Sequence, residues 1–431
     1  MIQISKRYEA MLDLLQRESL EYFLREFNPV NGLVADKTKD KWPASIAAVG
    51  LALAVYPVAV ERGYMSRAEA VTRTFTTLRF FWTSPHGAEP DATGYKGFYY
   101  HFLDMSTGRR AFDCELSTVD TALLLAGVLT AAVYFEQDSA EESEIRKLAD
   151  ALYRRVDWQW SQNGKATVEQ GWTPETGFLS YDWEGYDEGL ILYFLGLGSP
   201  TYPLPAESYA AWASKYEWRN LYGYEYLHAG PLFTHQLSHV WVDLRGIRDA
   251  FMREKHSDYF ENSRTATYIQ QQYAIQNPRQ FAGYGALCWG LTASDGPGPA
   301  TISVRGQEIE FFDYVARGVP EGPDDGTIAP WVVAASLPFA PEIVLPTLEH
   351  FIDDRNLKDS NPYGFKAAFN PTFPSKGASP DWISEWHFGL NEGPVVLMIE
   401  NFRSGFLWSL MRRSPYLIEG LRRAGFNGGW L

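Results

Sequence analysis

The strongest constraint on the fold is an alternation of two kinds of helical segment. Segments that are apolar on nearly every side alternate with amphipathic segments that have one polar face. A helix that is apolar all round is buried all round, whereas an amphipathic helix is half exposed. The apolar or mixed helices begin near residues 43, 117, 187, 234, 327 and 392. This order predicts an inner ring of buried helices wrapped by an outer ring.

The expected inner helices cover 43–60, 117–135, 187–197, 234–246, 327–337 and 392–402. The expected outer helices cover 5–27, 66–83, 140–157, 258–276, 341–354 and 415–424. The pattern predicts an all-α fold, an (α/α)6 toroid or barrel in which residues 1–431 form a single domain. One segment, TISVRGQEIEFF at 301–312, alternates with a period of two and predicts a small β-hairpin insertion.

Functional side chains are expected just before the inner helices. In such a toroid the inner helices run in one direction, so their N-termini meet at one end of the barrel. The positive ends of the helix dipoles and the unpaired backbone N–H groups gather there. Side chains on the approach to each inner helix would therefore line one shared cavity.

Carboxylates crowd two of these approaches. Before the second inner helix, Ser117 and Asp120 resemble a capping box, while Glu115 lies before the cap and Asp104 lies further upstream. Before the third inner helix the chain reads SYDWEGYDEG. Asp187 or Glu188 can cap that helix, which leaves Asp182 and Glu184 without a structural explanation. Trp183 and Tyr186 flank them.

The approach to the sixth inner helix, SEWHFGLNEGPVV, adds a further acid and further rings. Asn391 is expected to cap this helix, with Pro394 in its first turn. Glu392 would then lie in the first turn, and Trp386 and His387 would lie on the approach. Trp289, in the glycine-rich segment GYGALCWG, is a further ring that could face a ligand. Flat apolar rings beside polar groups suit the CH faces of sugars.

The net charge of −15 excludes several classes of partner. It repels nucleic acid and polyanionic sugars such as uronates, and it leaves neutral saccharides as the expected ligands. Paired carboxylates in an aromatic-lined cleft are the equipment of glycoside hydrolysis. A lyase acting on uronates would need positive charge around a Tyr or His base, which this chain does not favour. Phosphate-binding and GxSxG motifs are absent, and no cofactor is expected.

The histidine pair in THQLSH is the alternative with metal chemistry. His235 and His239 have the i, i+4 spacing of a metal pair, but the sequence has no HExxH motif and offers no identifiable third ligand. Cys114 and Cys288 are the only cysteines and have no zinc spacing. The expectation is therefore a site without a metal.

Four strings resemble the bacterial glucoamylase-like family, which includes β-1,2-glucanases of glycoside hydrolase family 144. They are ELSTVDTALLLAG, GWTPETGFLSYDWEGYDEGLILYFLGLGSP, FTHQLSHVWVDLRG and SEWHFGLNEGPVVLMIENFRSGFLW. The resemblance runs from about residue 40 to the C-terminus, and it is more specific for the family than for the substrate. It implies an (α/α)6 barrel with an acidic cleft, and metal-independent, inverting hydrolysis of β-1,2-linked glucose.

The resemblance also implies roles for individual residues. Glu115 and Glu184 are the expected catalytic pair, with the acid and the base not assigned between them. The expected substrate-binding residues are Asp104, Asp120, Asp182, Trp183, Tyr186, Trp289, Trp386, His387 and Glu392. Two alternatives remain, namely a hydrolase or transglycosylase that acts on another neutral glucan, and a non-catalytic glucan-binding toroid. The oligomeric state is left open.

The compartment depends on what precedes this chain. The start, MIQISKRYEAMLDLL, lacks the apolar run of a signal peptide, so the chain as it stands is expected in the cytoplasm. A leader outside the chain would place it in the periplasm, where members of the family are often exported. No segment approaches the roughly 18 uninterrupted apolar residues of a membrane span, and no membrane partner is expected.

Overall fold

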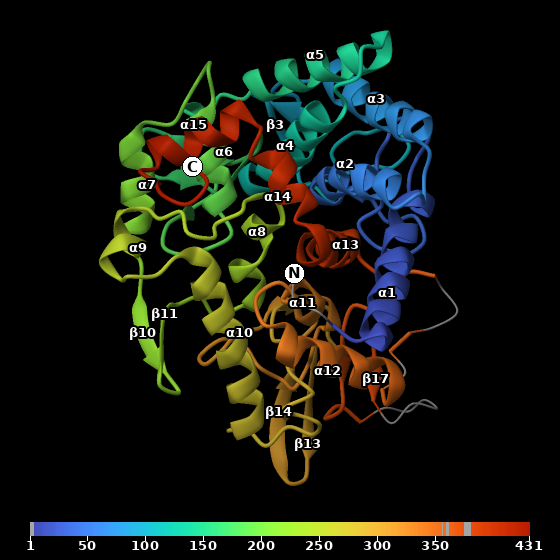
Figure 1. The fold of residues 1–431 in the computed structure, drawn as a ribbon, viewed down its shortest axis with the longest axis vertical. Coiled ribbons are helices and arrows are strands. Elements are labelled where there is room, and N and C mark those ends of the chain that lie inside the picture. Colours follow the sequence, from blue (N-terminus) through green and yellow to red (C-terminus); the bar gives the residue numbers. More distant parts are fainter. Residues whose placement is uncertain (1–3, 356, 359–361, 375–380) are drawn as a thin grey trace. The chain divides into compact units, whose positions relative to one another are not determined.

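The computed structural model describes residues 4–355, 357–358, 362–374 and 381–431. The chain divides into two compact units. Unit 1 contains 1–22, 217–237 and 259–404, and unit 2 contains 23–216, 238–258 and 405–431. Helices are the main regular structure in both units, as expected (Figure 1).

Unit 2 is built around the predicted buried helices α2 (Ile46–Glu61), α4 (Thr118–Tyr134) and α6 (Leu190–Gly198). Every residue of α6 is buried, as are residues 46–59 of α2 and 118–131 of α4. The predicted amphipathic helices α3 (Arg67–Thr83), α5 (Ala140–Arg154) and α15 (Pro415–Arg423) keep exposed faces. Helix α4 packs against α2, α5, α6 and α14 (Phe406–Met411). Three helices of unit 2 were not predicted, namely α7 (Ala206–Ala213), α9 (Ala250–Glu254) and α14.

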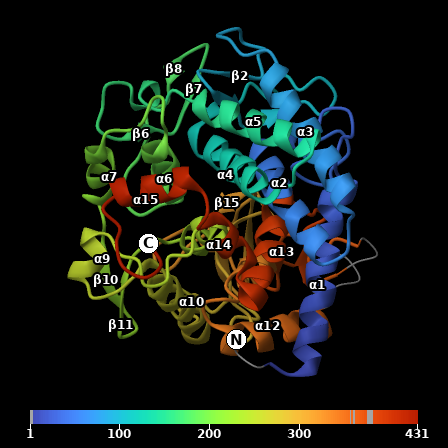
Figure 2. The ribbon, with the colours of Figure 1, turned by 45° about the horizontal axis from the view of Figure 1, so that its top comes forward.

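Helices α2 and α4 approach each other through two glycines. A Cβ atom on Gly127 would lie 2.0 Å from the Gly50 carbonyl oxygen, and one on Gly50 would lie 2.3 Å from the Leu123 carbonyl oxygen. Backbone therefore meets backbone at this crossing, where neither position has room for a side chain. Figures 1 and 2 show the two helices side by side.

Unit 1 contains most of the remaining predicted helices. They are α1 (Lys6–Arg25, whose last residues belong to unit 2), α10 (Tyr259–Gln276), α11 (Pro330–Ala335), α12 (Pro341–Asp353) and α13 (Gly389–Ser404). Helix α11 is buried throughout and packs against α12 and α13. The helix predicted at 234–246 is shorter than expected, since the chain forms a 3₁₀ turn at Leu232–His235 and then α8 at Leu237–Trp241.

Short strands make the all-α prediction only partly correct. The predicted hairpin is present as β13 (Ala300–Val304) and β14 (Gln307–Phe311). Unit 1 has three further antiparallel pairs, which the sequence analysis did not foresee: β10 (Trp218–Leu221) with β11 (Tyr224–Leu227), β12 (Ala293–Ser294) with β15 (Val315–Ala316), and β16 (Phe369–Asn370) with β17 (Trp382–Ile383).

Unit 2 carries a five-stranded antiparallel sheet and two further strand pairs. The sheet has the order β2 (Gly94–Tyr95), β3 (Phe98–Tyr100), β5 (Leu116–Ser117), β7 (Gly171–Thr173) and β8 (Gly177–Phe178). The pairs are β1 (Ala44–Ser45) with β4 (Phe102–Leu103), and β6 (Val168–Glu169) with β9 (Asp182–Trp183). Strands β1 and β5 run directly into α2 and α4, so strand pairing fixes the chain at the starts of two buried helices.

In the described part of the chain, no helix is both long enough and apolar enough to cross a membrane.

Candidate active site

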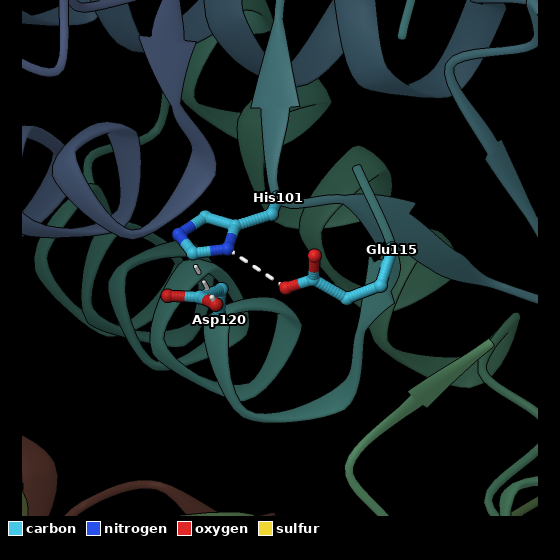
Figure 3. A group of neighbouring side chains, drawn as sticks. All are labelled: His101, Glu115 and Asp120. Carbon is cyan, nitrogen blue, oxygen red and sulfur yellow. Dashed lines mark hydrogen bonds and ion pairs between the residues drawn. The ribbon is translucent and has the colours of Figure 1, made fainter. Parts of the chain in front are cut away.

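A histidine and two carboxylates form the central cluster of unit 2. The Nδ1 atom of His101 lies 2.8 Å from Oε1 of Glu115, and its Nε2 atom lies 3.7 Å from Oδ2 of Asp120. Figure 3 shows the imidazole between the two carboxyl groups. The side chains of His101 and Glu115 are about one-third exposed, at 31% and 29%, so both can meet a ligand from solvent.

Strand pairing brings His101 and Glu115 together. Strands β3 and β5 pair Tyr100 with Leu116, and the next residues outward along the ladder are His101 and Glu115. The ladder continues there, because the His101 N–H donates to the Glu115 carbonyl oxygen at 3.0 Å. Side chains directly opposite each other across an antiparallel pair lie close together. The contact is therefore a consequence of backbone register.

Asp120 serves both the fold and the cluster. Ser117 is the N-cap of α4: its Oγ accepts from the Asp120 N–H at 3.2 Å and donates to Asp120 Oδ2 at 2.5 Å. The predicted capping interaction is confirmed. The same carboxyl group also faces His101. The start of α4 thus holds one carboxyl of the cluster in a fixed position.

The cluster has strongly perturbed protonation. Burial alone would lower the pKa of His101, but the charges of Asp120 and Glu115 outweigh burial and raise the pKa to about 9. Burial opposes ionisation of Glu115, yet its bond to His101 holds the Glu115 pKa below the usual value. At neutral pH the pair is therefore an imidazolium with a carboxylate.

Asp36 adds a third acid beside His101. Burial raises the pKa of Asp36 to about 6, against the opposing effects of a hydrogen bond from Trp42 and the charge of His101. The Trp42 Nε1–H donates to Asp36 Oδ2 at 3.0 Å. Neither His101 nor Asp36 was predicted from the sequence. The only local signal for His101 was its position in the aromatic run GFYYHFL, just before an acidic loop. Its contact with Glu115 depends on the pairing of β3 with β5, which are separate segments of the chain.

The expectation that Asp187 or Glu188 caps α6 is wrong. The N-cap of α6 is Gly189, and no side chain caps this helix. The Asp187 Oδ1 atom instead accepts from the Gly189 N–H at 2.9 Å and from Trp212 Nε1–H at 3.0 Å. Asp187 thus fixes the start of α6 from outside the helix, and Glu188 is not used as a cap.

Glu188 belongs to the electrostatic neighbourhood of the cluster. Burial, together with the charges of Asp120 and Asp187, raises the pKa of Glu188 to about 8 against the opposing effect of His101. Burial also raises the pKa of Asp187 to about 7. Unit 2 therefore combines an ionised carboxylate, Glu115, with a carboxyl that keeps its proton at neutral pH, Glu188.

Glu184 and its neighbours lie in the connection between β9 and α6. Glu184 is exposed, and its charge adds to the raised pKa of Asp187. Trp183 and Tyr186 are buried, and Trp183 Nε1–H donates to Thr118 Oγ1 at 2.9 Å, which ties β9 to the start of α4. Asp182 accepts from Lys165 at 2.7 Å and from Thr167 at 2.8 Å. Trp183 and Asp182 thus fix the segment that carries Glu184 and Glu188.

Asp104 has a local structural role. Its Oδ1 atom accepts hydrogen bonds from the N–H and hydroxyl groups of Ser106 and Thr107, at 2.7 to 3.1 Å. The bonds from Thr107 and Ser106 also hold the Asp104 pKa below its usual value. This carboxylate shapes the turn after β4.

The remaining predicted residues lie in unit 1. His387 is fully buried and its Nδ1 lies 3.4 Å from Glu392 Oε1, while burial raises the pKa of Glu392 against the effect of His387. The prediction that Asn391 caps this helix is wrong, because α13 already begins at Gly389. Trp386 is partly exposed. Trp289 is fully buried and donates from Nε1 to Thr347 Oγ1 at 3.0 Å, which is the environment of a core residue.

The His101 cluster also has the residue types of a metal site. Within the described residues, one group of three potential metal ligands lies close together, and it consists of His101, Glu115 and Asp120. Neither His235 nor His239 belongs to such a group. The direct 2.8 Å bond between His101 and Glu115 occupies the atoms that would hold an ion. A metal bound at about 2.0–2.2 Å from each ligand would have to separate them. The geometry fits an ion pair better than a metal centre.

The ion pair predicts how stability depends on pH. Because the pKa of His101 rises from 6.5 to about 9 on folding, its contribution is complete below pH 6.5 and is lost as the pH rises through 9. We expect the Tm to fall between pH 6.5 and 9, and to fall less in His101→Gln. Thermal unfolding followed by circular dichroism measures both.

His350→Gln is the control, since His350 also pairs with an aspartate, Asp354, but on a helix of unit 1. Its decrease in Tm should match that of the unchanged protein. An equal decrease in His101→Gln would show that the cluster does not stabilise the fold through protonated His101.

Comparisons with known proteins assign the chain to a family. A family model described as "Glycoamylase: Putative glucoamylase" matches residues 180–415, which is more than half of the chain. The chain therefore belongs to this glucoamylase-like family. The match includes the segment with Glu184 and Glu188 and the start of α13.

Relatives cover the whole chain. It is 29% identical to an exo β-1,2-glucooligosaccharide sophorohydrolase of Parabacteroides distasonis, over 96% of this chain and 58% of that protein. The chain thus spans little more than half the length of this curated relative. Two solved structures match with a TM-score of 0.86 over 100% of both chains: a protein of Bacteroides uniformis described as a putative glucoamylase, at 30% identity, and an endo-β-1,2-glucanase of Chitinophaga pinensis, at 27%.

Proposed function

We propose that this protein is a glycoside hydrolase that cleaves β-1,2-glucan or sophoro-oligosaccharides with inversion at the anomeric carbon. The main support is the combination of an ionised Glu115 and a proton-carrying Glu188 around His101. Inverting hydrolysis needs one carboxylate to activate water and one carboxylic acid to protonate the leaving oxygen. The substrate is proposed from the relatives, whose names specify β-1,2-linked glucans.

Glu115 is the proposed general base. Its bond to the His101 imidazolium keeps it ionised and fixes its orientation, and its partial exposure lets a water molecule reach it. His101 acts through Glu115 and is a positioning residue. Asp120 holds the other side of the imidazole.

The proton donor is proposed from the segment that contains Glu184 and Glu188. The sequence pairs Glu115 with Glu184, which is exposed and can meet a substrate. Protonation favours Glu188 as the proton donor, because a pKa of about 8 keeps this acid protonated at neutral pH. We propose Glu188 as the proton donor and Glu184 as a carboxylate that contacts the saccharide.

The arrangement of the helices is a further part of the proposal. The alternation of buried and amphipathic helices supports an (α/α)6 toroid in which residues 1–431 act as one catalytic domain. A neutral oligosaccharide or polysaccharide is the proposed partner.

Assay of reducing sugar released from linear β-1,2-glucan tests the function. We expect release of sophorose or longer sophoro-oligosaccharides, with no release from laminarin or from α-1,4-glucan. Polarimetry during turnover should show an initial α-anomeric product, and the rate should be the same in EDTA. Activity confined to another glucan, or products longer than the substrate, would instead identify the alternative hydrolase or a transglycosylase.

A further inference from the structure

Next to the His101 cluster, unit 2 presents a row of four rings. His101 stacks on Phe102 with the ring centroids 4.0 Å apart and the planes at 10°. Phe102 meets Phe112 at 5.9 Å, and Phe112 meets Trp42 at 5.1 Å. The row therefore runs without a gap from the proposed catalytic centre to an outer pair, Phe112 and Trp42.

The outer end of the row is exposed and conformationally strained. Phe112 is 60% exposed, although burying such a ring would stabilise the fold. Its backbone has φ = 58°, and the next residue, Asp113, has φ = 47°. A bulky residue in the left-handed region is a genuine outlier. Packing alone does not account for two successive residues with left-handed backbone, one of which carries an exposed aromatic ring.

A buried arginine holds this strained loop in place. The Arg110 side chain is only 2% exposed and donates to the carbonyl oxygens of Asp113 at 2.7 Å and Cys114 at 2.6 Å. Glu175 accepts two hydrogen bonds from the same guanidinium, and the Tyr100 ring lies 4.8 Å beneath it. The loop is therefore fixed before any ligand arrives, which reduces the ordering entropy lost on binding.

Polar groups hold the second ring of the pair in place. The ammonium groups of Lys37 and Lys39 lie over the Trp42 ring, 4.3 and 4.5 Å from its centroid, and the Trp42 N–H donates to Asp36. Asp36 in turn interacts electrostatically with His101. The exposed Phe112 ring beside these hydrogen-bonding groups matches a pyranose, which has apolar CH faces and hydroxyl groups at its rim.

We propose that Phe112, supported by the inclined Trp42 ring behind it, forms a stacking platform that binds a β-linked glucosyl residue of the substrate beside the Glu115 site. The identity of this ligand rests on the proposed function. The platform holds the saccharide chain through ring contacts, while the carboxyl groups act on the glycosidic bond. It makes no contact with the reacting atoms, so its contribution is to binding.

The test is steady-state kinetics of Phe112→Ala on linear β-1,2-glucan. Loss of one stacked ring is expected to raise KM about tenfold and to leave kcat within about twofold, because the ring binds ground state and transition state equally. Phe112→Tyr should restore the KM. Tyr202→Ala is the control, since Tyr202 is a 47% exposed ring of unit 2 outside the row. An unchanged KM in both Phe112→Ala and Trp42→Ala would overturn the platform.

Calorimetric titration of the same variants with sophoro- and laminari-oligosaccharides separates this proposal from the function. Each is titrated in the Glu115→Gln background, in which turnover is expected to be about 10³-fold slower. Weaker binding in Phe112→Ala than in Tyr202→Ala supports the platform, even if no β-glucan proves to be cleaved. Cleavage of β-1,2-glucan together with unchanged binding in Phe112→Ala refutes the platform and leaves the proposed function standing.

Discussion

Glu115→Gln is expected to lower kcat on β-1,2-glucan by about 10³-fold, the usual contribution of a general base. Glutamine retains the shape of the side chain and can still accept a hydrogen bond from His101, but it cannot take a proton from water. The KM should change little, because the saccharide loses no apolar contact. Single-point rates at saturating substrate, with circular dichroism to verify folding, measure the effect.

Asp113→Asn is the matched control for Glu115→Gln. Asp113 lies two residues away on the same loop, is exposed, and has a left-handed backbone that asparagine tolerates well. Its kcat should stay within about twofold of the unchanged protein. A Glu115→Gln variant with near-normal kcat would remove Glu115 from the mechanism, whereas an equal loss in both variants would indicate damage to the loop.

Glu188→Gln is expected to lower kcat by about 10²- to 10³-fold and to do so more than Glu184→Gln. The reason is protonation: the Glu188 pKa of about 8 lets it donate a proton at neutral pH. The same pKa sets the direction in which kcat should change with pH. Activity should be full below pH 8 and decline as the pH rises through 8, when Glu188 loses its proton. Measuring kcat from pH 5 to 10 tests this decline.

Leaving-group dependence gives a second test of Glu188. On an aryl β-sophoroside the departing phenolate needs no proton, so the loss in Glu188→Gln should be much smaller than on the glucan. The Glu115→Gln variant should stay slow on both substrates, because water must still be activated. A larger and leaving-group-dependent loss in Glu184→Gln would instead make Glu184 the acid, and the catalytic pair would then be Glu115 and Glu184, the two residues predicted from the sequence.

The helices could be predicted well from the sequence, because the burial of a helix determines the pattern of apolar residues over many positions. Segments such as 117–135 are apolar on every side, and α4 is buried almost throughout. Strands of two or three residues are too short to show such a pattern. Strand β5 is only Leu116–Ser117, and its two residues cannot display an alternation. The five-stranded sheet of unit 2 was therefore invisible, although the period-two hairpin at 301–312 was found.

The site was partly predictable for the same reason. Helix-start reasoning found Glu115 and Asp120, because both lie next to the cap of a strongly periodic helix. It missed His101, which joins them through the pairing of β3 with β5. Glu188 was misassigned because an acid near a helix start is so easily explained as a cap. The structure gives that position to Gly189 and leaves the carboxyl group beside Asp120.

The glycine crossing of α2 and α4 has a consequence for how a saccharide is aligned. Helix α2 begins four residues after Trp42, and α4 begins three residues after Glu115. Because Gly50 and Gly127 meet backbone to backbone, no side-chain rotamer can alter the spacing of these two helices. The aromatic ring and the carboxylate are thus carried on one rigid frame. A glucan held at one end by stacking would present the same bond to Glu115 at every turnover.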